Sequence, residues 1–232
     1  MKKSFIWFDL GYTLLYLKRE QPFIETLREF DLDADAHEVE RVFHLTDKYF
    51  MREFPGVFGG DRCHYMPWYF GMIQHRLGLR FDLCRFFQRW QKRIGTQVDS
   101  WHPYPYTADV LEDLRKKGYR MGIISNWDDS ARAILAKHGL DRFFEHIIIS
   151  SEVGSEKPEV EIFHKAIEAA RIDPGECIYV GDNYYDDAVG SRKAGMETII
   201  INRYGDLGIE ELQNCSVITD IRELEEQLTG GG

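Results

Sequence analysis

The sequence of 232 residues contains few cysteines, and their spacing excludes two kinds of site. Cys63, Cys84, Cys177 and Cys215 lie far apart and form no CxxC pair. This spacing argues against a zinc site and against a disulfide framework, and it favours reduced thiols in a cytoplasmic protein. The N-terminal stretch MKKSFIWFDL lacks the cleavage region of a secretory signal, which agrees with that compartment.

Basic charge and long hydrophobic runs are also scarce. Lys plus Arg number 29 against 39 for Asp plus Glu, so the net charge is −10. We expect no nucleic-acid partner, because basic residues that neutralise phosphates dominate such binding. We expect no membrane partner either, because no apolar run approaches the roughly 18 residues that a membrane-spanning helix needs. An acidic site can still bind a phosphorylated molecule if a divalent cation screens the charge.

Short apolar runs predict a buried parallel sheet. Hydrophobic residues make up 44% of the chain, which is enough for a sizeable core. Runs that are apolar at nearly every position are typical of strands covered on both faces. Helical patterns lie between these runs from residue 107 onward, and this alternation predicts an α/β, doubly wound, Rossmann-like fold. The predicted strands are residues 5–8, 121–124, 147–149, 178–180, 198–201 and 217–218, and the predicted helices are 107–117, 130–138, 160–170 and 186–194.

Residues 16–100 have a different character. They contain amphipathic helical patterns and few strand-like runs, with a turn-rich stretch at 54–67. The prolines of HPYPY, residues 102–106, predict an irregular return linker. We therefore expect a core formed by residues 1–15 and 101–232 and an inserted all-helical domain formed by 16–100. Its predicted helices cover residues 23–30, 39–50, 68–77 and 83–94.

Polar residues with complementary chemistry follow four of the predicted strands. In chain order they are Asp9, the pair Ser125 and Asn126, Lys157, and the acidic group Asp182, Asp186 and Asp187. Each residue alone is as readily explained as a helix cap, a turn residue or a solvated charge. The carboxyl ends of parallel strands meet at one edge of a sheet, however, and ligand sites form there. The combination therefore predicts a functional site.

The residue types suggest phosphoryl chemistry. A carboxylate such as Asp9 can attack phosphorus and form an aspartyl phosphate. A divalent cation must then separate the two anions, and Asp9 and Asp182 supply the oxygen ligands that Mg²⁺ prefers. Ser125 and Lys157 would donate to the phosphoryl oxygens.

Four segments resemble the motifs of the haloacid dehalogenase-like (HAD) hydrolase superfamily. They are FDLGYTLL, IISN, EKP and VGDNYYDDAVGSRKAGM. The resemblance covers nearly the whole chain and includes the helical cap that one class of the family inserts after the first strand. It implies that Asp9 is the nucleophile and Lys157 its catalytic partner. The residues that it implies bind the phosphoryl group are Ser125, Asn126 and Lys157. It also implies a Mg²⁺ site, formed by Asp9, the carbonyl of Gly11, Asp182 and Asp187, which Asp186 could share.

Gly11 departs from the family pattern. In phosphatases of this family the second residue after the nucleophile is normally an aspartate, whose carbonyl binds the metal and whose side chain protonates the leaving group. Gly11 keeps the carbonyl and lacks the acid, and such an acid is worth about 10²–10⁴ in rate. The residues that could replace it are Tyr12, Asp128, Asp129 and His64. Gly11→Asp should raise turnover of poor leaving groups if the pocket admits the side chain.

Three hypotheses follow from this departure. The favoured one is a Mg²⁺-dependent phosphatase that acts on a small phosphorylated metabolite. The second is a 2-haloacid dehalogenase, because a halide leaves without protonation; those enzymes work without the metal, however, and lack the pair Gly181-Asp182. The third is a non-catalytic relative, because the domain-containing protein 3 subgroup shares the ISN-aromatic-Asp and VGDNY stretches and also lacks the usual acid.

An aromatic, glycine-rich stretch lies in the predicted insertion. It surrounds Gly59 and Gly60 and includes Phe54, Phe58, Tyr65, Trp68 and Tyr69. Such a stretch could form a lid that closes over the site, could pack within the inserted domain, or could form a contact between two copies of the chain. The sequence is therefore compatible with a monomer or a homodimer.

Overall fold

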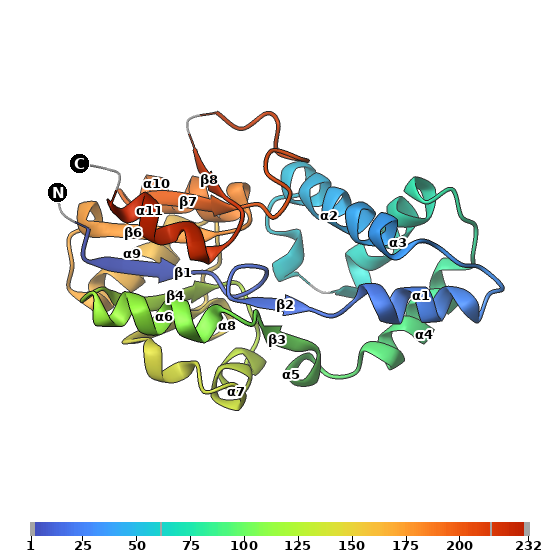
Figure 1. Cartoon of the computed structure of the whole chain (residues 1–232), viewed down its shortest axis with the longest axis horizontal. Helices are drawn as coiled ribbons and strands as arrows, with labels where there is room; N and C mark the ends of the chain where they lie inside the picture. Colours follow the sequence, from blue (N-terminus) through green and yellow to red (C-terminus); the bar gives the residue numbers. More distant parts are fainter. Residues whose placement is uncertain (1–2, 61, 214, 230–232) are drawn as a thin grey trace.

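The structure, a computed structural model, describes residues 3–60, 62–213 and 215–229. A six-stranded sheet with flanking helices forms one end of the molecule, and a group of helices forms the other (Figure 1). The strand order is β5-β4-β1-β6-β7-β8, and every neighbouring pair is parallel. The strands are β1 (Phe5–Phe8), β4 (Arg120–Ser125), β5 (His146–Ile149), β6 (Cys177–Gly181), β7 (Glu197–Ile201) and β8 (Ser216–Ile218), which confirms the six predicted strands.

Helices cover both faces of this sheet, which confirms the doubly wound α/β fold. Alternate residues of β1 face opposite ways, so Ile6 and Phe8 belong to one apolar cluster and Phe5 and Trp7 to another. The first cluster includes residues of α6 (Thr107–Lys116), α7 (Ser130–Lys137) and α11 (Leu224–Thr229). The second includes residues of α9 (Val160–Ala170), against which α10 (Val189–Lys193) also packs. We call this part of the molecule the sheet unit.

The helices α1 to α4 form a second unit with its own aromatic core, called here the helical unit. They are α1 (Glu20–Arg28), α2 (Ala36–Glu53), α3 (Arg62–Arg76) and α4 (Leu83–Ile94). Phe23, Phe43, Phe70 and Phe86 are buried at its centre. The side chain of Asp35 accepts hydrogen bonds from two backbone N–H groups and thereby begins α2 three residues before the predicted start.

The predicted turn-rich stretch 54–67 is partly wrong. Residues from Arg62 onward belong to α3, which contains Pro67. A proline inside a helix removes one backbone hydrogen bond. Tyr65 and Tyr69 are buried on either side of it in the helical unit, and this packing offsets the loss.

Two short strands connect the units, and both differ from the prediction. β2 (Leu15–Leu17) pairs antiparallel with β3 (Trp101–Pro103), so the outgoing and returning segments run side by side. The predicted insertion is therefore not all-helical at its start, and the return linker is not irregular at its beginning. Strands of three residues are too short to show a period-two pattern. The exact limits of the two domains, at residues 15 and 101, stay a prediction.

Short helical segments complete the chain. The predicted helix 186–194 divides into a π-helical turn, η4, followed by α10. The remaining segments are α5 (Gln97–Ser100), α8 (Ser150–Val153), η1 (Val57–Gly59), η2 (Asp141–Phe143), η3 (Pro174–Glu176), η4 (Tyr184–Ala188) and η5 (Ile221–Glu223). None of the helices in the described ranges has the length and apolarity needed to cross a membrane.

Candidate active site

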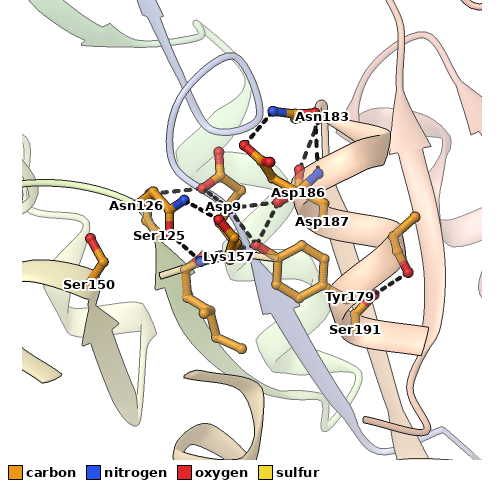
Figure 2. Close-up of polar contacts among 12 residues, drawn as sticks. Asp9, Ser125, Asn126, Ser150, Lys157, Tyr179, Asn183, Asp186, Asp187 and Ser191 are labelled. Carbon is orange, nitrogen blue, oxygen red and sulfur yellow. Dashed lines mark hydrogen bonds and ion pairs between the residues drawn. The ribbon is translucent and has the colours of Figure 1, made fainter. Parts of the chain in front are cut away.

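Asp9 occupies the centre of the edge where the parallel strands end. Its backbone N–H donates to the carbonyl of Val180, which continues the β1–β6 pairing by one residue. Its Oδ1 accepts hydrogen bonds from Oγ of Ser125 (2.8 Å) and Nζ of Lys157 (2.7 Å), and Figure 2 shows the three side chains pointing toward one another. The strand ends therefore bring together the three residues predicted to act on the phosphoryl group.

Lys157 makes three side-chain contacts within the site. It is 3% exposed, and its ammonium also donates to Oδ1 of Asp187 (2.6 Å) and to the hydroxyl of Tyr179 (3.0 Å). Burial alone would lower the pKa of Lys157, but the carboxylates of Asp187 and Asp9 hold this pKa well above its usual value. Lys157 therefore stays positively charged beside Asp9.

Asn126 holds the loop that presents Lys157. Its side-chain amide donates to the carbonyl of Lys157 (2.8 Å) and accepts from the backbone N–H of Lys157 (2.7 Å). Both polar atoms of the amide therefore contact the backbone of Lys157, so Asn126, which directly follows β4, holds the loop between α8 and α9. The predicted contact between Asn126 and a substrate stays a prediction.

Two adjacent acidic residues of the fourth motif, Asp186 and Asp187, have different surroundings. Asp187 is fully buried, and besides Lys157 it accepts from the backbone N–H of Asn183 (2.9 Å). Gly181 makes room for it, because a Cβ at that position would lie 2.1 Å from Oδ2 of Asp187. Asp186 instead accepts from the backbone N–H of Gly56 in the helical unit (2.9 Å). The adjacent aspartates thus face different partners.

Asp182 lies where the sheet unit meets the helical unit. Burial raises its pKa to about 7, a shift that the ammonium of Lys48 opposes. Nζ of Lys48 donates to the carbonyl of Asp182 (2.6 Å) and lies 3.5 Å from its Oδ2. Lys48 lies in α2, outside the four sequence motifs, so it is not among the site residues predicted from the sequence.

The acidic group fits a divalent cation. Four buried carboxyl groups, those of Asp9, Asp182, Asp186 and Asp187, lie in the same site as two buried ammonium groups, those of Lys48 and Lys157, so acidic groups outnumber basic groups by two. Among the described residues, no donor contacts Oδ2 of Asp9 or Oδ1 of Asp182. The described part of the chain contains no ready group of three His, Cys, Asp or Glu ligands. Two carboxylates and a carbonyl nevertheless suit Mg²⁺, which keeps several of its waters.

Two tryptophans occupy the space beside Gly11. A Cβ at Gly11 would lie 3.4 Å from the indole of Trp127 and 3.5 Å from that of Trp101. These indoles lie 4.8 Å apart, and the ring of Tyr12 lies 5.3 Å from Trp101. The φ angle of Gly11 is not positive, so its backbone would accept other residues. The aromatic neighbours are what limits the side chain at this position.

The proposed replacement acids do not lie equally close to the site. Tyr12 and Asp128 line the same cleft as Asp9, whereas Asp129 and His64 are exposed and do not line it. Burial raises the pKa of Tyr12 well above its usual value, although Arg19 opposes this shift, so the phenol is a weak proton donor. Oδ1 of Asp128 accepts from the backbone N–H of Ser130 at the start of α7 (2.9 Å).

A cleft of about 940 Å³ lies between the two units and contains this site. Its sheet-unit wall combines the acidic residues and Lys157 with Trp101 and Trp127, and its helical-unit wall includes the aromatic residues Phe43, Phe58, Tyr65 and Trp90. The stretch predicted to form a lid therefore contributes to the cleft. Sequence reasoning missed a second polar feature of this wall, the hydrogen-bonded group of Arg19, Asp47 and Tyr69.

The buried pair of Lys157 and Asp187 makes a testable contribution to stability. We expect Lys157→Met to lower the free energy of unfolding by about 3–5 kcal/mol, because it leaves Asp187 as an unpaired buried charge. Adding Asp187→Asn should restore part of the loss by removing that charge. Urea unfolding of the wild type, the single variant and the double variant in metal-free buffer measures both effects. A double variant less stable than Lys157→Met would contradict this account.

The comparisons with known proteins identify the family. The model of the haloacid dehalogenase-like hydrolases matches residues 8–201. The chain belongs to this family, which confirms the resemblance and the expected hydrolase class. The haloacid dehalogenase-like hydrolase domain-containing protein 3 of Bos taurus is 25% identical over 200 residues, which cover 83% of this chain and 79% of the relative. The predicted similarity to that subgroup is therefore also confirmed.

Two archaeal relatives are named glyceraldehyde 3-phosphate phosphatase. The protein of Methanothermobacter thermautotrophicus is 34% identical over 139 residues, covering 54% of this chain and 58% of the relative. The chain thus matches less than two thirds of that relative's length. The protein of Pyrococcus furiosus is 32% identical over 179 residues, covering 70% of this chain and 69% of the relative.

Solved structures show the same fold. A HAD phosphatase from Thermococcus onnurineus superposes with a TM-score of 0.59 at 27% identity, covering 99% of both chains. A HAD hydrolase from Bacillus subtilis, solved with bound magnesium, gives a TM-score of 0.70 at 18% identity, covering 99% of this chain and 100% of the other. At 18% identity, the similarity to the Bacillus subtilis structure shows a shared fold only.

Proposed function

We propose that this protein is a Mg²⁺-dependent phosphomonoester hydrolase that works through an aspartyl phosphate on Asp9. The observation that carries the proposal is the pair of donors on Oδ1 of Asp9, one from Ser125 and one from Lys157. A hydroxyl and an ammonium beside the carboxylate can donate hydrogen bonds to the oxygens of an incoming phosphoryl group. The two relatives named as phosphatases support the same conclusion.

The reaction would proceed in two displacements. Asp9 attacks phosphorus, the bond between phosphorus and the ester oxygen breaks, and the leaving group departs with the electron pair. During this attack Ser125 and Lys157 would donate to the phosphoryl oxygens and stabilise the charge that develops on them. Water attacks the phosphorus of the aspartyl phosphate, which releases inorganic phosphate and restores Asp9.

The magnesium site would be formed by Asp9, Asp182 and the carbonyl of Gly11. Asp187 would support it by holding Lys157 and the backbone of Asn183 in place. The cation, when bound, would screen the negative charges of the carboxylates and the phosphoryl group. The excess of buried carboxyl groups over buried ammonium groups supports a divalent ion at this position.

The substrate would be a small phosphorylated metabolite in the cytoplasm, and the helical unit would act as the cap that closes over it. The cleft is large enough for such a molecule, and its aromatic wall would exclude water from the reaction. Gly11 provides no acid, and two indoles stand beside it, so the enzyme would favour leaving groups that depart as stable anions.

An assay of two substrate classes tests this proposal. Phosphorylated metabolites, aryl phosphates and 2-haloacids are supplied with Mg²⁺ and with a chelator. We expect phosphate release that the chelator abolishes. Chloride release that persists in the chelator would instead establish a dehalogenase, the second candidate, which the missing acid at Gly11 also allows. No turnover of either class would favour a binding protein without catalytic activity.

Isotopic oxygen separates the two chemistries further. In single turnover in ¹⁸O-labelled water, attack on an aspartyl phosphate at phosphorus places the label in inorganic phosphate. A dehalogenase forms an aspartyl ester, and attack at its carbonyl carbon places the label in Asp9. Mass spectrometry of the peptide that contains Asp9 and of the released phosphate therefore reports which intermediate forms.

A further inference from the structure

One face of α2 makes a row of polar contacts with the sheet unit. Residues four apart on a helix share a face, and Glu40, His44, Lys48 and Arg52 follow this spacing. Most of their partners lie in the loop after β7, which passes close to α2 in Figure 1. The contacts join Glu40 to Arg203 (3.1 Å), Nε2 of His44 to the carbonyl of Leu207 (2.9 Å), Lys48 to Asp182 and Arg52 to Glu211 (3.5 Å).

Lys48 differs from the other members of this row. It is 5% exposed, and its partner belongs to the acidic site rather than to the loop. The carbonyl of Asp182 accepts a hydrogen bond from Nζ of Lys48, and the carboxylate of Asp182 lies within ion-pair distance of the same nitrogen. Lys48 thus connects the helical unit directly to a proposed magnesium ligand.

Lys48 approaches Asp182 from outside the substrate cleft. Asp182 lines both the large cleft and a neighbouring cavity of about 60 Å³, whereas Lys48 lines only the small cavity. The ammonium of Lys48 therefore lies on the side of Asp182 that faces the small cavity. An effect of Lys48 on the site would act through its contact with Asp182.

We propose that Lys48 is a positioning residue that shares the carboxylate of Asp182 with the divalent cation, so that metal binding and the docking of α2 on the sheet unit oppose each other. The inference rests on the magnesium site of the proposed function. Two cations that share one carboxylate repel each other. Lys48 reaches Asp182 from α2, so this repulsion weakens a contact that holds α2 on the sheet unit. Coupling between two binding events is reciprocal, so each one weakens the other by the same factor.

Calorimetric titration of the full chain with MgCl₂ at constant ionic strength tests this coupling. We expect Lys48→Met to bind Mg²⁺ roughly 5- to 30-fold more tightly than the wild type, within the usual range of such couplings. Lys48→Arg keeps the charge and should remain near the wild-type affinity. Arg52→Met is the matched control, because it removes a cation of the same row whose partner is Glu211, and its affinity should stay within about twofold of the wild type.

The outcomes separate this inference from the proposed function. Suppose that the wild type binds Mg²⁺ and that Lys48→Met, with a native fold by circular dichroism, binds it equally or more weakly. This result would overturn the inference and leave the magnesium site intact. No binding of Mg²⁺ by any variant would remove the metal site and with it both proposals. An equal gain of affinity in Arg52→Met would show a general charge effect and would also overturn the role of Lys48.

Hydrogen exchange gives a second readout that does not depend on activity. In the wild type, Mg²⁺ should accelerate amide exchange in α2 and in residues 203–212, because binding weakens the contact at Lys48. In Lys48→Met the same addition should leave this exchange unchanged. Equal responses of the two proteins to Mg²⁺ would contradict the proposed coupling.

Discussion

Asp9→Asn should reduce kcat for a phosphomonoester by about 10⁴- to 10⁶-fold, the range found when a catalytic nucleophile or its partner is removed. An amide cannot attack phosphorus at a useful rate, so the covalent route is lost. The amide oxygen can still accept from Ser125 and Lys157, which donate to Oδ1 in the wild type. The substitution therefore removes the chemistry with little change in the local geometry.

The experiment needs a control for charge and a control for folding. Asp129→Asn removes an exposed aspartate that does not line the cleft, and its turnover should equal that of the wild type. Urea unfolding should show that Asp9→Asn is folded at the assay temperature. Turnover within tenfold of the wild type in a folded Asp9→Asn protein would exclude the aspartyl phosphate mechanism and would favour direct attack by water.

The sheet and the convergence of the site could be predicted from sequence because both depend on local signals. Continuous apolar runs mark strands buried on two faces, and parallel strands present their carboxyl ends at one edge. The positions of Asp9, Ser125 and Lys157 after successive strands were therefore sufficient to place their side chains near one another. The structure adds the atoms involved, with Oδ1 of Asp9 receiving both donors.

The contacts between the two units could not be predicted in this way. Helical periodicity shows which face of a helix is apolar, but it does not show which other element a polar residue meets. Lys48 reads in the sequence as one more solvated lysine, and only the docking of α2 places it on Asp182. The adjacent Asp186 and Asp187 likewise read alike, yet one contacts Gly56 and the other Lys157.

Gly11 illustrates the same limit at the catalytic centre. The sequence shows that an acid is missing, but not what fills its place. Trp101 comes from β3 at the return of the chain and Trp127 from the loop after β4, so the two indoles meet only in the folded protein. These two indoles occupy the space beside Gly11 where the side chain of an aspartate would lie.

Turnover should therefore depend steeply on the leaving group, and Gly11→Asp alone should not repair it. We expect aryl phosphates to exceed alkyl phosphates in kcat/KM by about 10²–10⁴, the value of the missing acid. In Gly11→Asp the first side-chain atom already touches both indoles, and the carboxyl group has to extend beyond it. Combining Gly11→Asp with Trp127→Ser removes the nearer indole, and this double variant should raise turnover of alkyl phosphates by up to about 10²-fold.

The measurement is kcat/KM at fixed pH and Mg²⁺ for a series of phosphate esters whose alcohols span a wide range of pKa. The wild type and Trp127→Ser alone should show equally steep dependence on the leaving-group pKa, since neither has an acid at position 11. The double variant should show a shallower slope, with little change for the best leaving groups. A shallow slope in the wild type would mean that another group, such as Asp128, already donates the proton. A gain in Gly11→Asp alone equal to that of the double variant would show that the indoles yield to the carboxyl group.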